Sequence, residues 1–138
     1  MAKADVDIEA AKKVKDGLDV WDDILRYAQT GFHTIDPADM LRFRWYGIYQ
    51  QKPNEGHFML RVKIPSGNMS AEQLRAVARV TKEYANNIAD VTTRQNFQFH
   101  WLTIENLPTV IGILNDSGLT TSGACGDILR NVCGCPVA

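Results

Sequence analysis

Apolar and polar side chains alternate with a period of two along residues 57–64. The apolar positions are Phe58, Leu60, Val62 and Ile64. The positions between them are His57, Met59, Arg61 and Lys63. Because successive side chains of a strand point to opposite faces, this alternation predicts a strand with one buried face and one polar face.

Two further segments have the character of strands. Residues 41–51 alternate between apolar and mainly basic or aromatic side chains, and residues 91–104 are rich in aromatic and β-branched residues. The turn-forming run Lys52-Pro53-Asn54-Glu55-Gly56 lies between the first segment and residues 57–64. Such a run favours a hairpin between those two strands.

Helical patterns occupy most of the remaining chain. Ser70 and Gln73 have capping-box spacing before an amphipathic helix that extends to about Asn86, and another helix is predicted over residues 107–118. At the N-terminus, residues 7–16 and 19–31 predict two short helices, the second capped by Asp19 and ended by Gly31. The order β-β-α-β-α predicts an α+β fold, an antiparallel sheet with helices on one face, preceded by the N-terminal helices.

The polar side of this sheet is predicted to be strongly basic. If residues 91–104 form a regular strand, Phe97, Phe99 and Trp101 face the core, and the opposite face carries Arg94, Asn96, Gln98 and His100. The neighbouring strands add Arg42, Arg44, Arg61 and Lys63. Such a face suits a polycarboxylate ligand, a small oxyanion or an acidic protein. The alternative is a solvated basic face that discourages edge pairing.

Bulk composition narrows the class of protein. The chain has 138 residues, 45% hydrophobic and 22% charged, which fits one globular domain. Its net charge of −1 gives no indication of a nucleic-acid or acidic-membrane partner. It has neither an apolar run of membrane-spanning length nor an N-terminal signal pattern, so we expect a cytoplasmic protein with no membrane partner.

The three cysteines give a weak metal signal. Cys125, Cys133 and Cys135 all fall near the C-terminus, but their spacing does not match common zinc or iron–sulfur motifs. We therefore predict free thiols and no metal site in this chain. The abrupt ending at residues 133–138 suggests a piece of a longer protein.

Three arginine-containing segments carry a family resemblance. They are Phe58-Met59-Leu60-Arg61, Thr92-Thr93-Arg94-Gln95-Asn96-Phe97-Gln98-Phe99-His100, and Arg130-Asn131-Val132. In this order they resemble the siroheme-dependent nitrite and sulfite reductases, which also carry a 4Fe-4S cluster. The stretch Gly134-Cys135-Pro136-Val137-Ala138 resembles the sequence that follows in that family.

The resemblance implies a fold, a reaction and residue roles. It implies a helical segment at residues 1–35, a ferredoxin-like half domain at 36–119 and the start of a siroheme-binding domain at 120–138. The implied reaction is six-electron reduction of nitrite to ammonia or of sulfite to sulfide, with a donor such as ferredoxin. Arg61 and Arg130 would act catalytically on the substrate oxyanion. The implied siroheme-binding residues are Arg94, Asn96, Gln98 and His100.

The resemblance also implies what this chain lacks. The family's cluster cysteines and catalytic lysines lie beyond these residues, so we expect the chain alone to be inactive and to hold neither siroheme nor cluster. Without the second half domain it is a candidate homodimer, through Trp45, Tyr46, Ile48 and Tyr49. Two alternatives remain: a stand-alone ferredoxin-like module that binds an anion or an acidic protein, and a structural domain with a solvated basic face.

Overall fold

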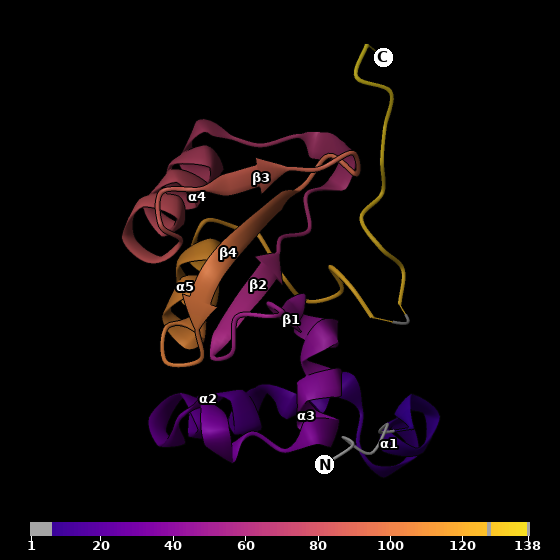
Figure 1. The fold of residues 1–138 in the computed structure, drawn as a ribbon. Helices are drawn as coiled ribbons and strands as arrows, with labels where there is room; N and C mark the ends of the chain where they lie inside the picture. The colour runs from indigo at the N-terminus through magenta and orange to yellow at the C-terminus, as the bar shows by residue number, and fades with distance from the viewer. Residues whose placement is uncertain (1–6, 127, 138) are drawn as a thin grey trace.

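A computed structural model describes residues 7–126 and 128–137 (Figure 1). The α-helices are α1 (Ile8–Val14), α2 (Trp21–Thr30), α3 (Pro37–Arg42), α4 (Ala71–Tyr84) and α5 (Leu107–Asp116). The 3-10 turns are η1 (Gly17–Val20), η2 (Phe32–Thr34), η3 (Phe43–Tyr46) and η4 (Pro65–Gly67). The strands are β1 (Ile48–Gln50), β2 (His57–Arg61), β3 (Ala89–Val91) and β4 (Phe97–Thr103). The predicted α+β fold is confirmed.

The strands form one antiparallel sheet in the order β1-β2-β4-β3. Helices α4 and α5 lie side by side against one face of it (Figure 1). That face buries Phe58, Leu60, Phe99 and Leu102 completely, together with apolar residues of both helices. We call the opposite face, turned away from α4 and α5, the open face. The predicted core side of residues 57–64 is therefore confirmed, since Val62 and Ile64 are buried as well.

The predicted strand over residues 41–51 is wrong for most of its length. Asp36 accepts a hydrogen bond from the Ala38 amide and caps α3, and Pro37 occupies the first helical turn. Helix α3 continues into η3, which ends at Gly47 with a left-handed φ of 73°. Only residues 48–50 pair with β2. As a consequence Arg42 and Arg44, both predicted on the basic sheet face, lie outside the sheet: Arg42 is buried in α3, and Arg44 belongs to η3.

The predicted single strand over residues 91–104 is two strands. A turn over residues 92–96 separates β3 from β4, and it is closed by the Thr92 amide donating to the Asn96 carbonyl at 2.9 Å. Gln95 has a left-handed φ of 59°, which no regular strand accommodates. The element order is therefore β-β-α-β-β-α rather than β-β-α-β-α.

Strand β4 also contains an irregularity that moves Trp101 to the open face. The register between β2 and β4 shifts between Phe58 and Leu60, and Trp101 has a φ of 65°. A bulge of this kind places one extra residue on one strand and breaks the alternation. The Trp101 ring meets the His57 ring, with centroids 5.6 Å apart, while Leu102 takes the core position. The prediction that Trp101 faces the core is therefore wrong.

The predicted helix signals are confirmed with one exception. Ser70 and Gln73 form the capping box of α4, and the Gly31 amide donates to the Tyr27 carbonyl at the end of α2. Asp19 does not cap α2. Asp16 instead accepts from the Leu18 amide at 2.8 Å and caps the preceding turn η1. No helix within residues 7–126 and 128–137 has the length and apolar character needed to cross a membrane.

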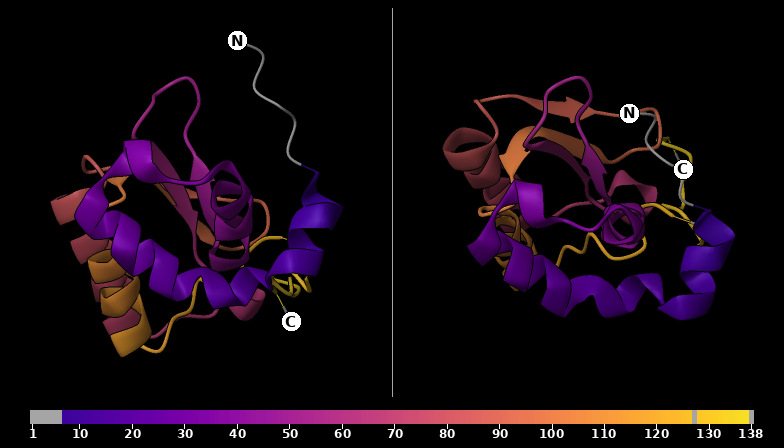
Figure 2. Two further views of the ribbon diagram at one scale, coloured as in Figure 1. Left: turned by 90° about the horizontal axis from the view of Figure 1, so that it is seen from below. Right: turned by 60° about the horizontal axis from the view of Figure 1, so that its bottom comes forward.

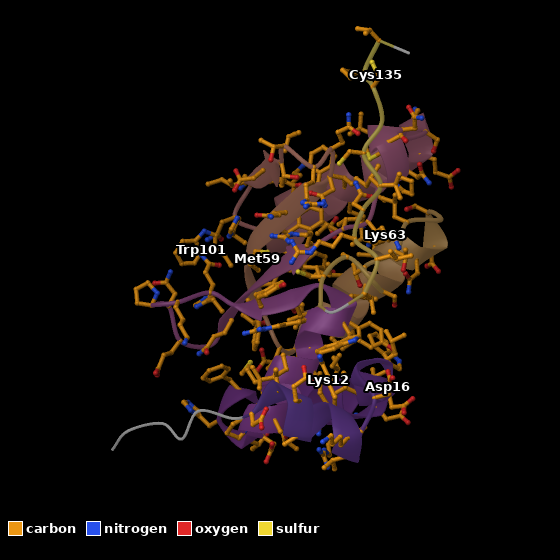
Figure 3. The ribbon with its side chains drawn as sticks, turned by 90° about the vertical axis from the view of Figure 1, so that its right-hand side faces the viewer. Lys12, Asp16, Met59, Lys63, Trp101 and Cys135 are labelled. Atoms are coloured by element: carbon orange, nitrogen blue, oxygen red, sulfur yellow. The ribbon has the colours of Figure 1, made fainter. Side chains whose placement is uncertain are left out.

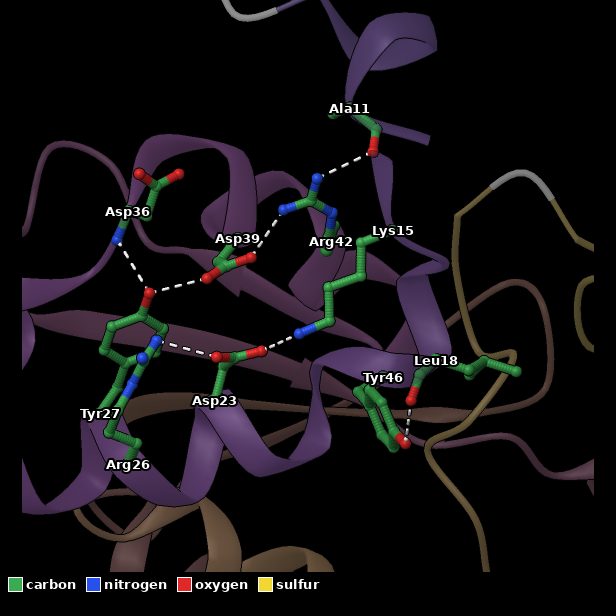
Figure 4. Close-up of polar contacts among 10 residues, drawn as sticks. All are labelled: Ala11, Lys15, Leu18, Asp23, Arg26, Tyr27, Asp36, Asp39, Arg42 and Tyr46. Carbon is green, nitrogen blue, oxygen red and sulfur yellow. Dashed lines mark hydrogen bonds and ion pairs between the residues drawn. The ribbon is translucent and has the colours of Figure 1, made fainter. Parts of the chain in front are cut away.

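The N-terminal helices cross one end of the sheet (Figures 1 and 2). Val20, Ile24 and Tyr27 join the same hydrophobic core as the sheet. The Tyr46 hydroxyl donates to the Leu18 carbonyl at 2.8 Å (Figure 4). The ring centroids of Trp21 and Tyr46 lie 5.5 Å apart.

This packing covers the surface predicted for a homodimer. Trp45 and Ile48 are buried, and Gly17 packs directly beneath the Trp45 ring. The predicted contact through Trp45, Tyr46, Ile48 and Tyr49 is therefore wrong, because the chain's own N-terminal residues occupy part of that surface. Self-association by another surface stays a prediction.

Candidate anion-binding site

Arg61 ends β2 on the open face, as its place in the alternation predicts. Its Cα partner across the sheet is Gln98 on β4. With the amide oxygen of Gln98 facing Arg61, that oxygen accepts hydrogen bonds from Nε at 3.0 Å and from Nη2 at 2.8 Å. The remaining nitrogen, Nη1, donates to Cys125 Sγ at 3.4 Å. These partners fix the direction of the guanidinium, and neither of them is a carboxylate.

The strand that carries Arg61 is held closely against the preceding turn. The Arg61 amide donates to the Gly47 carbonyl at 2.9 Å. A Cβ atom at position 47 would lie 2.5 Å from the Arg61 carbonyl oxygen, and the backbone there is left-handed. Glycine is thus required at position 47, and the backbone of Arg61 is fixed as firmly as its side chain.

Tyr49 and Cys125 lie next to the guanidinium group of Arg61. The Tyr49 hydroxyl donates to Cys125 Sγ, and the thiol is buried. Burial, followed by the contact with Cys125, raises the pKa of Tyr49 to about 12, although the charges of Arg61 and Arg44 act to lower it. The two guanidinium carbons lie 5.7 Å (Arg44) and 5.8 Å (Arg61) from the centroid of the Tyr49 ring. Two cations therefore share one aromatic ring, which stays neutral at physiological pH.

Arg94 lies in the turn between β3 and β4 rather than in a strand. Its side chain is exposed, and its backbone amide is held by the Thr92 hydroxyl at 3.2 Å. Asn96 closes the same turn and is only 2% exposed. Its Oδ1 accepts from the Thr92 hydroxyl, whereas its Nδ2 is buried without a partner among the described residues. The expectation that Arg94 and Asn96 share a strand face with Gln98 is therefore wrong, because the turn rotates them away from it.

His100 remains on the open face but is engaged with an acid. Its Nε2 lies 3.0 Å from Oδ2 of Asp90, which is the β3 partner of Gln98. Figure 3 looks towards the open face, where Met59, Lys63 and Trp101 lie and which the C-terminal segment bearing Cys135 crosses. The open face is thus a mixture of cations, amides and aromatic rings.

The C-terminal segment brings the third arginine next to the second. Asn131 is 4% exposed and binds the backbone on both sides of it. Its Oδ1 accepts from the Ile64 amide at 2.8 Å, and its Nδ2 donates to the Arg94 carbonyl at 2.7 Å. Arg130, directly before it, is exposed. The turn with Arg94 and the segment with Arg130 are therefore fastened together.

Charge pairing separates these arginines from Arg26, Arg42 and Arg79, whereas Arg75, exposed on α4, likewise lacks a carboxylate partner among the described residues. Arg44, Arg61, Arg94 and Arg130 have no carboxylate partner within the part of the chain that the structure describes. Arg42, by contrast, donates to Asp39 at 2.7 Å and to the Ala11 carbonyl at 2.8 Å (Figure 4). Guanidinium groups with fixed geometry and no counter-charge match carboxylates and small oxyanions.

The same residues do not form a metal centre. Across residues 7–126 and 128–137, no three side chains of His, Cys, Asp or Glu gather as a metal site would require. Cys125 is buried against Tyr49 and Arg61, and Cys133 and Cys135 are exposed free thiols.

Sequence reasoning missed two members of the site. Tyr49 stands in an apolar run, and Cys125 is 76 residues away from it. No periodicity connects them, because their contact depends on how residues 120–126 return across the end of the sheet. Asn131 belongs to the third arginine segment, but no pattern in the sequence indicates that its side chain is buried.

Known proteins resemble this chain in both sequence and structure. The family model for the nitrite/sulfite reductase ferredoxin-like half domain matches residues 49–117. This match contains Arg61, Arg94, Asn96, Gln98 and His100, and Arg130 lies beyond it.

Individual relatives extend the match to most of the chain. A sulfite reductase (ferredoxin) of Mycobacterium tuberculosis is 39% identical over 148 residues, covering 94% of this chain and 27% of the relative. A ferredoxin–nitrite reductase of Synechococcus elongatus is 39% identical over 132 residues, covering 94% and 26%. The solved structure of the Mycobacterium tuberculosis NirA protein has a TM-score of 0.87 at 38% identity, covering 94% of this chain and 27% of that one. The chain thus spans about a quarter of the length of these relatives.

Proposed function

Because the chain belongs to the nitrite/sulfite reductase family and contains its ferredoxin-like half domain, we propose that it supplies the anion-binding face of a siroheme-dependent reductase. The proposed reaction is the six-electron reduction of nitrite to ammonia or of sulfite to sulfide. In this proposal the chain is the N-terminal part of a larger protein, which we call the complete reductase. Ferredoxin, an acidic protein, is the proposed electron donor, and the cytoplasm is the proposed location.

The orientation of Arg61 is the observation that carries the proposal. Gln98 and Cys125 hold its three guanidinium nitrogens, yet no carboxylate neutralises it within the described residues. Arg42 is oriented by an acid, Asp39, whereas Arg61 is oriented by an amide oxygen and a sulfur atom and keeps its charge available. A preoriented, uncompensated cation is suited to hold a small anion whose charge changes during reaction. Arg61 and Arg130 are the proposed contacts for the substrate oxyanion.

Siroheme carboxylates fit the other donors of the site. Arg94 offers an exposed guanidinium, and Asn96 offers a buried Nδ2 that lacks a partner among the described residues. Gln98 and His100 lie on the adjoining strand. We propose that these four residues hold and orient siroheme, which supplies the electron-transfer chemistry when bound. Arginine stays protonated at all physiological pH values, so Arg61 and Arg130 stabilise charge and leave proton delivery to other groups.

The described residues do not fit the 4Fe-4S cluster. A cluster of this type takes four thiolates, and the three cysteines here are dispersed, with Cys125 engaged by Tyr49 and Arg61. We therefore assign no step to the cluster in this chain. Its ligands are proposed to come from the rest of the complete reductase.

The test measures siroheme content and turnover in the complete reductase. Nitrite and sulfite are supplied separately with reduced ferredoxin, and siroheme is quantified from its visible absorption. Arg94→Ala is expected to lower siroheme content several-fold, because it removes a charged contact to the cofactor. Arg79→Ala is the matched control, since Arg79 lies on α4 and pairs with Glu83 at 3.1 Å.

Two results would count against the proposal. One is wild-type siroheme content in Arg94→Ala, which would remove Arg94 from the cofactor site. The other is binding of ferredoxin without reduction of either anion, which would favour a non-catalytic module that binds an acidic partner.

A further inference from the structure

Asn131 is buried in a segment whose neighbours are not. It is 4% exposed, whereas Leu129 and Val132 are 89% and 64% exposed. Apolar burial therefore does not explain why the chain turns Asn131 inwards. Hydrogen bonding explains it, because both the oxygen and the nitrogen of the side-chain amide bind backbone groups.

The two hydrogen bonds of Asn131 reach two different parts of the site. The acceptor Oδ1 takes the Ile64 amide, three residues beyond Arg61 at the exit of β2. The donor Nδ2 goes to the carbonyl of Arg94 itself, in the turn between β3 and β4. Since Arg130 is the adjacent residue, one side chain connects the backbones that carry all three arginines.

Only an amide meets both demands. An aspartate at this position would keep an acceptor for Ile64 but would bring a second oxygen against the Arg94 carbonyl. An alanine would leave the Ile64 amide without this partner and the Arg94 carbonyl with only the weaker donor Cys133 Sγ at 3.4 Å. Position 131 therefore requires an amide group and not merely a side chain of this size. Asn131→Asp keeps the size and removes the amide donor, so it tests that requirement.

Other contacts hold the segment down without passing through Asn131. Gln95 donates from Nε2 to the Gly134 carbonyl at 2.8 Å and accepts from the Gly134 amide at 2.9 Å. The Ser66 amide donates to the Val132 carbonyl at 2.7 Å. These bonds can keep the segment docked when Asn131 is altered, so a loss at Asn131 is expected to change alignment more than folding.

We propose that Asn131 is a positioning residue that fixes Arg94 and Arg130 relative to each other. This inference rests on the proposed function, in which Arg94 holds siroheme and Arg130 holds the substrate anion. Two guanidinium groups without nearby acids repel each other, and an unfastened pair would separate before the ligand arrives. Holding them at a set spacing moves that cost from binding to folding. Asn131 touches neither ligand in this proposal and acts through the two arginines.

The test compares Asn131→Asp with Asn131→Ala and a matched control in the complete reductase. The control is Asn115→Asp, which makes the same chemical change at an exposed position of α5, away from the three arginines. For Asn131→Asp we expect the KM for the oxyanion to rise about tenfold with a smaller fall in kcat, the size of one lost hydrogen bond. Siroheme content is expected to fall less than in Arg94→Ala. The control is expected to stay within about twofold of the wild type in both quantities.

A second readout uses the 138-residue chain without cofactor. Trypsin cleavage after Arg130 requires residues 130–132 to detach from Ile64, Ser66 and Arg94, to which they are hydrogen-bonded. The rate of cleavage is followed by mass spectrometry. We expect faster cleavage in both Asn131 variants than in the wild type.

The outcomes distinguish the inference from the proposed function. Wild-type KM, siroheme content and cleavage rate in Asn131→Asp would overturn the positioning role, because aspartate has nearly the same shape as asparagine. If Asn131→Asp is unchanged while Arg94→Ala loses siroheme and Arg130→Ala loses turnover, the proposed function still stands. Unchanged siroheme and turnover in those two arginine variants would instead defeat the proposed function, and the cleavage rate alone would then report whether Asn131 fastens the segment.

Discussion

Arginine is used in two different ways in the N-terminal helices and on the open face of the sheet. In the helices, Arg26 pairs with Asp23 at 2.8 Å and Arg42 pairs with Asp39 at 2.7 Å. On the open face, Arg61 is bound by an amide oxygen and a thiol, and Arg44 of the preceding turn η3 lies against the Tyr49 ring that Arg61 also approaches. Both regions fix their guanidinium groups, but only the first neutralises them.

This difference separates structural cations from cations available to a ligand. The carboxylate of Asp39 also accepts from the Tyr27 hydroxyl at 2.7 Å, so the Arg42 network joins three parts of the helical layer (Figure 4). Arg61 also links separate parts of the chain, Gln98 on β4 and Cys125, but no carboxylate of the described residues takes part. We therefore expect substitutions in the two regions to have opposite consequences, large for stability in one and large for ligand binding in the other.

The largest expected effect on stability is that of Arg42→Ala. Removing one partner of a buried ion pair leaves Asp39 without its counter-charge, which typically costs about 3–5 kcal/mol. Urea unfolding of the 138-residue chain measures this loss. Arg79→Ala is the control, because the exposed pair with Glu83 contributes at most about 1 kcal/mol. Equal losses in the two variants would remove the distinction between buried and exposed pairs.

Arg61→Ala is expected to cost the chain much less stability. It removes hydrogen bonds to Gln98 and Cys125 but also removes repulsion from the neighbouring cation Arg44, so we expect a loss of about 1 kcal/mol. The same urea experiment measures it. A loss as large as that of Arg42→Ala would mean that Arg61 is a structural residue, contrary to the comparison.

A multivalent anion is expected to stabilise the chain by binding Arg61 on the open face and Arg94 in the turn between β3 and β4. Citrate carries three carboxylates and serves as a probe for a polycarboxylate ligand. At about five times its Kd it would add roughly 1 kcal/mol to the free energy of unfolding. Thermal unfolding in citrate is compared with unfolding in chloride at equal ionic strength. The gain should disappear in the Arg61→Ala/Arg94→Ala double variant and persist in Arg79→Ala, and a gain that is the same in all three would indicate general salt effects.

The smallest expected effect is a change of stability with pH from Tyr49. Its pKa is raised from 10.0 to about 12 in the folded chain, so folding favours the protonated phenol. This stabilisation is fully present below pH 10 and is lost as the pH rises from 10 to about 12. Because the ring is partly exposed, we expect less than about 1 kcal/mol. The stability difference between the wild type and Tyr49→Phe should change over this pH window, and a constant difference would argue against the shift.

Local rules predicted the elements whose signals lie within a few residues. The β2 alternation and the Ser70–Gln73 capping box gave correct elements because the sequence spacing itself creates the contact. The segment at 41–51 misled the same rules, since a helix cap at Asp36 outweighed an alternation that continued by chance. The turn before β4 was missed because Gln95 carries no obvious turn signal for its left-handed backbone.

The site was predictable in its cations and not in what orients them. Arg61, Arg94 and Arg130 stood out as motif residues. The partners that direct or fasten them, Gln98, Cys125 and Asn131, act through contacts spanning 37 to 67 residues of sequence. Such contacts follow from the tertiary fold, which the local pattern does not contain.

The central claim is that the unneutralised arginines of the open face act on a substrate anion. Turnover of nitrite and of sulfite by the complete reductase carrying Arg61→Ala, measured together with its siroheme content, tests this most directly. We predict a loss on the order of a hundredfold or more in kcat, about 3–4 kcal/mol, with siroheme content near that of the wild type. Arg130→Ala should behave in the same way. Wild-type turnover in both variants, with normal folding and siroheme content, would contradict the account.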